Sequence, residues 1–200
     1  MPSWTSRLDA LRRRHPRAIL GVTGPPGAGK STLAEAIATA TDDAVYVPMD
    51  GFHLADVELE RLGRLDRKGA IDTFDAYGYL ALLQRIRAQG DETVYAPAFD
   101  RDLEQPVAGS IAVLPSHRLV VTEGNYLLDD DDPWPLIRAL LDEVWFVDAA
   151  PDERRRRLVA RHIAFGKAPE RAETWVRAVD DVNAARIERV KPRADWVLTS

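Results

Sequence analysis

The sequence predicts an α/β fold built on a mostly parallel sheet of five strands. Short apolar runs alternate along the chain with longer amphipathic segments, which is typical of strands and helices stacked in layers. Most of the short runs are apolar on nearly every residue, as strands buried on both faces of a sheet are. No segment repeats or has low complexity. With 200 residues, 46% of them hydrophobic, the chain can form one compact domain over 1–200.

The expected elements follow from these runs in chain order. A surface helix with Leu8 and Leu11 turned inward is expected near the N-terminus. The expected strands are 18–22, 44–48, 118–123 and 143–148, each predicted to be buried on both faces, and a last strand at 194–199. The further expected helices are 31–40, 79–89, 152–164 and 171–190. Ligands of such sheets bind beyond the carboxyl ends of the strands, so residues there are the first candidates for a site.

The charge balance excludes several classes of function. Lys and Arg number 27 against 32 Asp and Glu, a formal net charge of −5, so there is no general attraction to nucleic acid or to acidic membranes. The chain has no cysteine, which excludes disulfides and thiol nucleophiles. The first residues lack the apolar run of a signal peptide, and no apolar run could span a bilayer. We expect a cytoplasmic protein, either a monomer or a homodimer.

The stretch GPPGAGKS carries the clearest functional signal. It fits the pattern GxxxxGKS with Gly24, Gly29, Lys30 and Ser31, and it lies between an expected strand and an expected helix. In such a phosphate-binding loop, or P-loop, backbone N–H groups converge on phosphate oxygens at a helix N-terminus. Lys30 would reach the β and γ phosphates, and the Ser31 hydroxyl would ligate Mg²⁺. A chance glycine-rich turn is the alternative.

Two prolines limit which amides of this loop can donate. Pro25 and Pro26 have no N–H, so the donating amides are expected to begin at Gly27. The residues expected to contact the nucleotide are Gly24, Gly27, Ala28, Gly29, Lys30, Ser31 and Thr32.

Acidic residues follow two of the expected strands. Asp50 comes after 44–48 and would lie beside the loop if the two strands are neighbours, where its carboxylate could accept a proton from an attacking hydroxyl or bind Mg²⁺. Glu123 ends 118–123 in the manner of a magnesium-holding acid. The alternatives are a turn at Asp50-Gly51 and a structural acid at Glu123. Asp148 is expected to be structural.

An arginine-rich helix follows the fourth strand. Arg154, Arg157 and Arg161 would share one helical face, and at least one of them is expected to reach the transferring phosphate. A solvated basic face paired with nearby acids is the alternative. The run Asp129 to Asp132 is expected to form an exposed loop.

Taken together, these segments resemble a known family. The loop, PMDGFH, TFDAYGYLALLQRI, YAPAFDRD, VVTEGNYLL and the arginine helix are similar to the uridine kinase, phosphoribulokinase and bacterial pantothenate kinase family, and closest to its nucleoside/nucleotide kinase and fructose transport system kinase branch. The resemblance implies a P-loop NTPase three-layer sandwich with a small helical lid at about 154–172. It implies that Asp50 is the base and that Glu123 helps to hold Mg²⁺. The counterparts of Arg157 and Arg161 are catalytic lid residues near the phosphates, and that of Arg154 touches the acceptor.

The resemblance also bears on the acceptor pocket. YAPAFDRD is similar to the family segment PxYD, with Phe99 in place of tyrosine and Asp100 retained. The ending NAARIERVKPRADWVL is similar to a pantothenate kinase tail, which implies that Asn183 and Arg193 lie near acceptor and adenine. His53 and Asn125 are the polar groups expected to meet acceptor hydroxyls, although His53 could equally be a packing residue. The remaining lining is expected from segments around Phe52, Phe74 and Tyr95.

The sequence therefore predicts a Mg²⁺- and ATP-dependent kinase. The γ-phosphate would pass to a hydroxyl of a small metabolite, such as a nucleoside, a sugar or a pantothenate-like compound. Two alternatives stay open: a nucleoside monophosphate kinase, which needs no base at Asp50, and a non-kinase P-loop switch protein. The guanine-reading segment NKxD of a GTPase is missing from the sequence, but ATP and GTP are not otherwise separated.

Overall fold

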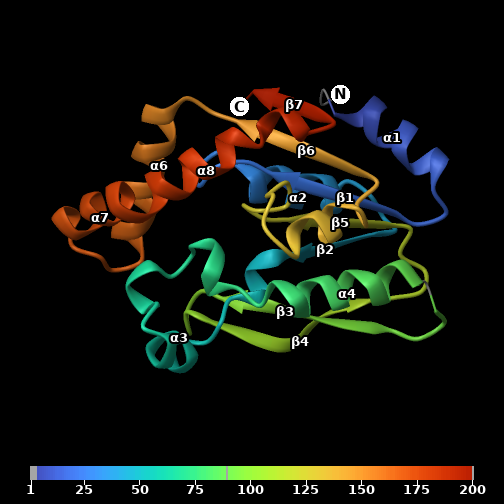
Figure 1. The fold of residues 1–200 in the computed structure, drawn as a ribbon. Helices are drawn as coiled ribbons and strands as arrows, with labels where there is room; N and C mark the ends of the chain where they lie inside the picture. The colour runs from blue at the N-terminus through green and yellow to red at the C-terminus, as the bar shows by residue number, and fades with distance from the viewer. Residues whose placement is uncertain (1–3, 89, 200) are drawn as a thin grey trace.

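Five parallel strands form the centre of the molecule, as the sequence predicts. A computed structural model describes residues 4–88 and 90–199, and in these residues the sheet has the order β2-β5-β1-β6-β7 (Figure 1). The strands are β1 (Ala18–Thr23), β2 (Ala44–Pro48), β5 (Leu119–Glu123), β6 (Glu143–Asp148) and β7 (Trp196–Thr199). Since β5 lies between β1 and β2, the first two strands of the chain are not neighbours.

The burial of each strand follows from its place in the sheet. The central strands β1, β5 and β6 are buried along nearly their whole length. The prediction of burial on both faces is wrong for β2, where only Val47 is buried. The reason is that β2 lies at an edge of the sheet, so one side of it has no neighbouring strand.

Helices cover both faces of the sheet and make the fold three-layered. On one face, α1 and α2 pack with Ala18, Leu20 and Val22 of β1, and the inward turn of Leu8 and Leu11 is confirmed. On the other, α4, α5 and α8 pack against alternate strand residues such as Ile19. The helices are α1 (Thr5–Arg14), α2 (Lys30–Thr39), α3 (Asp56–Leu62), α4 (Ala76–Ala88), α5 (Trp134–Arg138), α6 (Pro151–Ala164), α7 (Pro169–Trp175) and α8 (Asp181–Arg189).

Two helix predictions need correction. The helix expected over 79–89 begins three residues earlier, at Ala76, and its expected last residue, Gln89, lies outside the described residues. The single helix expected over 171–190 is divided, because a π-helical turn at Val176–Asp180 separates α7 from α8. None of the helices in the described parts of the chain has the length and apolar character needed to cross a bilayer.

A β-hairpin lies outside the main sheet and was not predicted as strands. Strands β3 (Val94–Asp100) and β4 (Gln105–Val113) pair antiparallel, and the segment YAPAFDRD forms most of β3 and the turn after it. The hairpin packs against α4 and against the short 3₁₀ turn Met49–Phe52. A Cβ on Gly51 would lie 2.3 Å from the carbonyl oxygen of Pro97, so this close approach of turn and hairpin requires glycine. The hairpin thus lies next to Asp50.

The carboxyl ends of the central strands define one edge of the molecule. In the parallel register Glu123 pairs with Val22 on one side and with Pro48 on the other. The helices α3, α6 and α7 lie at this same end, on the left of Figure 1. Residues that follow β1, β2 and β5 therefore meet there, beneath the helices that follow β6.

Candidate active site

The P-loop connects β1 to α2 at the carboxyl edge of the sheet. β1 ends at Thr23, and α2 begins at Lys30 directly after Gly29. Gly29 has φ of 95°, a left-handed conformation that favours glycine, and apart from its neighbours along the chain no described residue has an atom within 4 Å of where its Cβ would be. The loop therefore leaves open space at the N-terminus of α2, where backbone N–H groups and the helix dipole favour an anion. Ser31 and Thr32 follow in the exposed first turn of α2.

One amide of the loop is already used within it. The Ala28 N–H donates to the carbonyl oxygen of Pro25 at 3.2 Å. In this conformation Ala28 therefore cannot donate to a phosphate in the way that the sequence analysis expects. The amides of Gly27, Gly29, Lys30 and Ser31 remain the candidates.

Lys30 is a buried cation beside the loop. Its Nζ donates to the Pro25 carbonyl oxygen at 3.2 Å and lies 3.7 Å from Oε1 of Glu123. Burial lowers the pKa of Lys30, against the charges of Glu123 and Asp50, which raise it. A buried ammonium whose desolvation is only partly offset gains from an additional anion. The position thus favours negative charge next to the open loop.

Glu123 collects the neighbouring donors at the end of β5. Its Oε2 accepts hydrogen bonds from the Ser31 hydroxyl and from the Tyr46 hydroxyl, each at 3.2 Å. Burial raises the pKa of the Glu123 carboxyl, while Lys30 and the two hydroxyls oppose this shift. Tyr46 was missed by the sequence analysis, because a tyrosine within an expected strand is more often a packing residue.

Ser31 and Glu123 fit a Mg²⁺ site of the kind that P-loop proteins use. The described residues hold no group of three or more His, Cys, Asp or Glu side chains that would form a metal cage. Mg²⁺, however, is usually bound by one or two protein oxygens together with substrate phosphates and water. A hydroxyl and a carboxylate at 3.2 Å beside the open loop suit that arrangement.

Asp50 lies in the turn Met49–Phe52 that follows β2. It is separated from the P-loop strand by β5, so the expected direct neighbourhood of strands is absent. It follows Pro48, which pairs in register with Glu123, and its charge raises the pKa of Lys30 and of Glu123, so Asp50 acts electrostatically on both side chains. Its Oδ2 accepts a hydrogen bond at 2.8 Å from Nη2 of Arg101, a residue in the turn between β3 and β4. Arg101 was not predicted.

Aromatic side chains pack around His53, which directly follows the turn that carries Asp50. The His53 ring packs 4.1 Å from the Phe74 ring and 4.9 Å from the Phe99 ring, measured between centroids. Nδ1 of His53 lies 2.8 Å from the Asp50 carbonyl oxygen, and since a carbonyl only accepts, Nδ1 carries the proton. Burial lowers the pKa of His53, which keeps the ring neutral near pH 7 and leaves Nε2 as an acceptor.

Two other predicted acceptor residues have backbone roles in this structure. Oδ1 of Asp100 accepts the N–H groups of Asp102 and Leu103 at 2.9 Å, so this carboxylate closes the hairpin turn. The Asn125 carbonyl oxygen accepts a hydrogen bond from the Thr23 hydroxyl at 3.2 Å, which ties the segment after β5 to the end of β1.

The three arginines of α6 differ in where they lie. Arg154 is buried, and its Nε donates to the Ala149 carbonyl oxygen, so it stabilises the start of α6 rather than facing an acceptor as expected. Arg157 pairs with Glu153 at 2.7 Å and reaches the Gly27 carbonyl oxygen of the P-loop at 3.4 Å. The charge of Arg161 lowers the pKa of Lys30, which places Arg161 within electrostatic reach of the loop.

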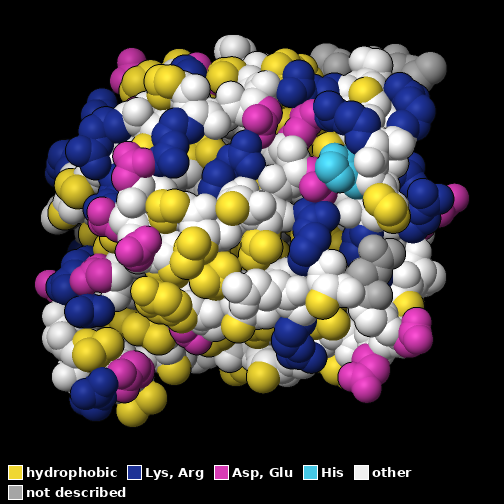
Figure 2. All heavy atoms as spheres, turned by 45° about the vertical axis from the view of Figure 1, so that its right-hand side comes forward, with side chains coloured by type: hydrophobic (Ala, Val, Ile, Leu, Met, Phe, Trp, Pro, Cys, Tyr) yellow, Lys and Arg dark blue, Asp and Glu magenta, His cyan; other side chains and the backbone are white. Residues whose placement is uncertain are grey.

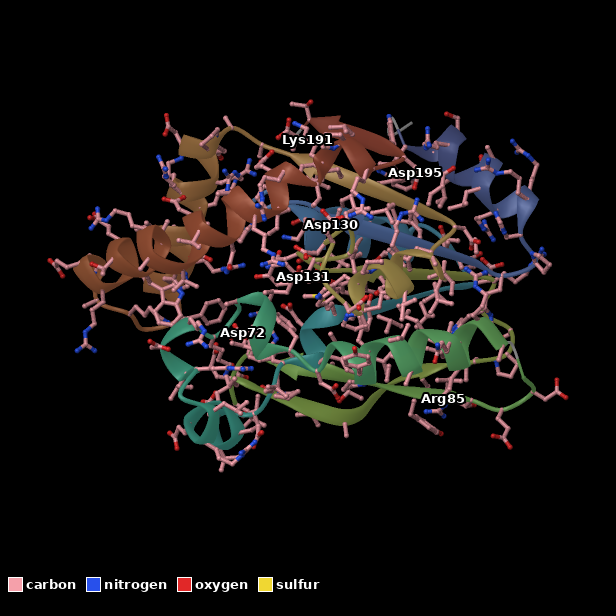
Figure 3. All side chains as sticks on the ribbon, viewed as in Figure 1. Asp72, Arg85, Asp130, Asp131, Lys191 and Asp195 are labelled. Carbon is pink, nitrogen blue, oxygen red and sulfur yellow. The ribbon has the colours of Figure 1, made fainter. Side chains whose placement is uncertain are left out.

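Arg193 takes part in a network around the aspartate run. It donates to the Leu128 carbonyl oxygen at 2.9 Å and pairs with Asp130. The expectation that the whole run is exposed is wrong for Asp129, which is buried and held by two hydrogen bonds from Arg186 on α8. Asp131 also pairs with Arg186, and both Asp130 and Asp131 lie near the centre of the view in Figure 3. Arg193 was expected near adenine, and in this structure its guanidinium is already bound by Leu128 and Asp130.

Comparison with known proteins identifies close relatives. No family model matches the chain. It is 32% identical to "Putative uridine kinase C227.14" of Schizosaccharomyces pombe over 96% of this chain and 87% of the relative. It is 37% identical to "ATP-dependent kinase-like protein notR'" of Aspergillus versicolor over 68% of this chain and 84% of the relative.

A solved structure is similar over nearly its whole length. The crystal structure described as a "putative fructose transport system kinase" from Silicibacter sp. TM1040 superimposes with a TM-score of 0.85 and 36% identity, covering 96% of this chain and 95% of the other. Pantothenate kinases, including one from Limosilactobacillus reuteri with 28% identity over 67% of this chain, are further relatives, and the chain spans about half of their length.

Proposed function

Because the chain belongs to the uridine kinase-like family of P-loop kinases, we propose that it transfers the γ-phosphate of ATP to a hydroxyl group of a small metabolite. One observation carries the choice of a hydroxyl acceptor. Asp50 lies in the turn that follows Pro48, and Pro48 pairs in register with Glu123, so the Asp50 carboxylate is at the carboxyl edge of the sheet and outside the P-loop. Its charge also raises the pKa of Lys30 and of Glu123. A base in this position is useful only if the acceptor has a proton to lose.

The donor end would hold the triphosphate by backbone and charge. The open N-terminus of α2 offers amides to the phosphates, and the buried ammonium of Lys30 offers a positive charge beside them. Ser31 and Glu123 would hold Mg²⁺, which supplies charge neutralisation at the β and γ phosphates when bound. The Lys30–Glu123 contact at 3.7 Å keeps both side chains at the edge of the loop.

The transfer step then needs little covalent help from the protein. The acceptor oxygen forms a bond to the γ-phosphorus while the bond from that phosphorus to the β–γ bridging oxygen breaks, and ADP leaves. The hydroxyl proton passes to the carboxylate of Asp50. Lys30 and Arg161 stabilise the charge on the transferring group, and Arg157 joins α6 to the loop through Gly27. Most of the rate therefore comes from positioning and electrostatics.

The charge pattern of the surface agrees with a small acceptor rather than a polyanion. Figure 2 shows Lys and Arg side chains interspersed with Asp and Glu over the face that it presents. Many of the described arginines pair with acids, as in the pairs Arg61–Glu58, Arg155–Asp181 and Arg186–Asp129. Neutralised cations of this kind give nucleic acid little long-range attraction.

The test is the substitution Asp50→Asn, with Asp66→Asn as matched control. Asp66 is exposed and pairs only with Arg67 among the described residues. We expect acceptor-dependent ADP release by Asp50→Asn to fall about 10²- to 10⁴-fold while ATP affinity is retained, because only proton acceptance is lost. The control should keep the wild-type rate. The assay measures ADP release over a panel of nucleosides, ketoses, pentoses and pantothenate.

Two results would count against the proposal. A near-wild-type rate for Asp50→Asn would favour a phosphate acceptor, as in a nucleoside monophosphate kinase, since a phosphate needs no base. ADP release that no small acceptor changes, and that only a partner protein stimulates, would favour a switch protein.

A further inference from the structure

The ion pair between Arg101 and Asp50 covers the proposed base. Nη2 of Arg101 lies 2.8 Å from Oδ2 of Asp50, and the two side chains are 49% and 29% exposed. Arg101 is in the turn between β3 and β4, whereas Asp50 follows β2, so the pair joins two separate segments of the chain. An acceptor hydroxyl that approaches Oδ2 of Asp50 therefore meets the Arg101 guanidinium.

Arg101 keeps hydrogen-bonding capacity beyond this pair. A guanidinium has five N–H donors in a planar fork. Within the described residues, Asp50 is the one acceptor to which Arg101 donates. The Nε and Nη1 donors of Arg101 are therefore unpaired within the described residues, on a side chain that is half exposed beside Asp50.

The surroundings hold the guanidinium in place. The Arg101 Cζ atom lies 5.0 Å from the centroid of the Phe99 ring, in a cation–π contact. Lys68 lies 5.3 Å from the same centroid, but its ammonium is already bound by Asp56 and by the Glu104 carbonyl oxygen, both at 2.6 Å. Of its three N–H donors, Lys68 thus has one left, whereas Arg101 uses one of five, so Arg101 has the larger unused donor capacity of the two cations at Phe99.

A cation beside the proposed base matters in an acidic protein. The formal net charge is −5, so the chain as a whole repels small anions and only a local group can attract one. Burial lowers the pKa of His53, Asp50 raises it, and Lys68 and Arg101 lower it further, so both cations lie within electrostatic reach of this ring. The planar fork of arginine matches the geometry of a carboxylate or a phosphate, with which it forms two parallel hydrogen bonds.

We propose that the acceptor is an anionic polyol, whose carboxylate or phosphate binds Arg101 while one of its hydroxyls faces Asp50. This inference rests on the proposed kinase function and adds the chemical class of the acceptor. On binding, the anion takes up the free donors of Arg101 and draws the guanidinium from Oδ2 of Asp50. That oxygen then accepts the hydroxyl proton. Acceptor binding and release of the base are thereby coupled through one side chain.

The experiment compares acceptors that share a carbon skeleton. One set is D-ribose, D-ribonate and D-ribose 5-phosphate, and another is D-fructose, D-gluconate and D-fructose 6-phosphate. ADP release is measured with wild-type protein, Arg101→Met, Arg101→Lys and the control Arg85→Met. Arg85 is exposed on α4 and lies on the right of the view in Figure 3, whereas α3, α6 and α7 at the carboxyl end of the sheet lie on the left.

We expect the anionic members of a set to be better acceptors than the neutral one. Arg101→Met should lower kcat/KM for the anionic acceptor about 10²-fold, mainly through KM, because charge-assisted hydrogen bonds are lost. Its effect on the neutral member should be under about 3-fold, and Arg101→Lys should restore part of the loss, since a point charge replaces the fork. Preference for the carboxylate or for the phosphate within a set identifies which anion is bound.

Three outcomes would overturn the inference. The first is a neutral sugar or nucleoside as best acceptor with kcat/KM unaffected by Arg101→Met. The second is a higher rate in Arg101→Met with every acceptor, which would mean that Arg101 only blocks Asp50. In both cases acceptor-dependent ADP release persists, so the kinase function stands. The third is ADP release independent of every acceptor, which would remove the proposed function and this inference together.

Discussion

The two ends of the candidate site are built in different ways. At the donor end, the side chains of Lys30 and Glu123 are 8% and 6% exposed and lie where β1, β5 and α2 meet. At the acceptor end, Asp50 and Arg101 are 29% and 49% exposed and come from a 3₁₀ turn and a hairpin turn. The first set is held by regular hydrogen-bonded elements, the second by two connecting segments.

This difference separates what the fold determines from what it leaves free to vary. The parallel register brings Glu123 beside Val22 and Pro48 whatever the acceptor is, because the backbone ladder sets it. The hairpin β3–β4 is outside that ladder and contacts the site through its turn, so substitutions there can change the acceptor without disturbing the sheet. Changes at the donor end should therefore affect all acceptors equally, and changes at the acceptor end only some.

The largest effect is expected from Lys30→Ala. Removing the buried ammonium takes away a positive charge beside the proposed phosphate site and should lower kcat/KM about 10³-fold, by the same factor for each acceptor. ATP affinity, measured by titration calorimetry, should fall as well. Arg85→Ala is the control. A loss that varies strongly from one acceptor to another would contradict the division between the two ends.

A smaller effect is expected at the lid, where two arginines can be compared. Arg161 acts electrostatically on Lys30, while Arg157 is neutralised by Glu153 and touches only the Gly27 carbonyl of the loop. We expect Arg161→Ala to lower kcat about 10²-fold and Arg157→Ala about 10-fold, with ATP saturating. Arg177→Ala serves as the control, because the Arg177 side chain is exposed and pairs with Glu173. If Arg157→Ala is the more damaging change, α6 must move to bring Arg157 to the phosphate.

The sequence predicted the fold almost completely, for a physical reason. Buried parallel strands are apolar throughout and the intervening helices are amphipathic, so period and burial indicate the same elements. The β3–β4 hairpin was missed because its residues alternate little and Pro97 and Pro106 interrupt them. The edge position of β2 was missed as well, because strand order is a property of the whole chain and not of the segment.

The donor end of the site was predictable for the same reason, whereas at the acceptor end Asp50, His53 and Phe99 were predicted and Arg101 was not. Gly29, Lys30 and Ser31 are adjacent in sequence, so spacing alone predicts their arrangement. Arg101 and Asp50 are 51 residues apart and meet only because the hairpin packs on the turn after β2. Arg154 was expected at the acceptor from the family resemblance, and helical spacing predicted only that it shares a face with Arg157 and Arg161. Spacing does not say which part of that face is buried, and Arg154 is buried and donates to the Ala149 carbonyl oxygen.

The smallest effect concerns pH and compares two histidines. Burial lowers the pKa of His53 and of His117 below 6.5, so the unfolded chain binds protons there more tightly than the folded one. Each histidine therefore contributes stability that is lost as pH falls from about 6.5 through its lower folded pKa. The decrease in the free energy of unfolding between pH 7.5 and pH 5.5, measured in urea, should be smaller in His53→Gln and in His117→Gln than in wild type.

Only His53→Gln should also raise the KM of the acceptor, because His117 lies after the hairpin, where its Nδ1 accepts the Leu114 N–H. If His53→Gln has the same pH dependence of unfolding as wild type, the His53 ring of the wild-type protein takes up a proton freely between Phe74 and Phe99. The acceptor end would then be open to water.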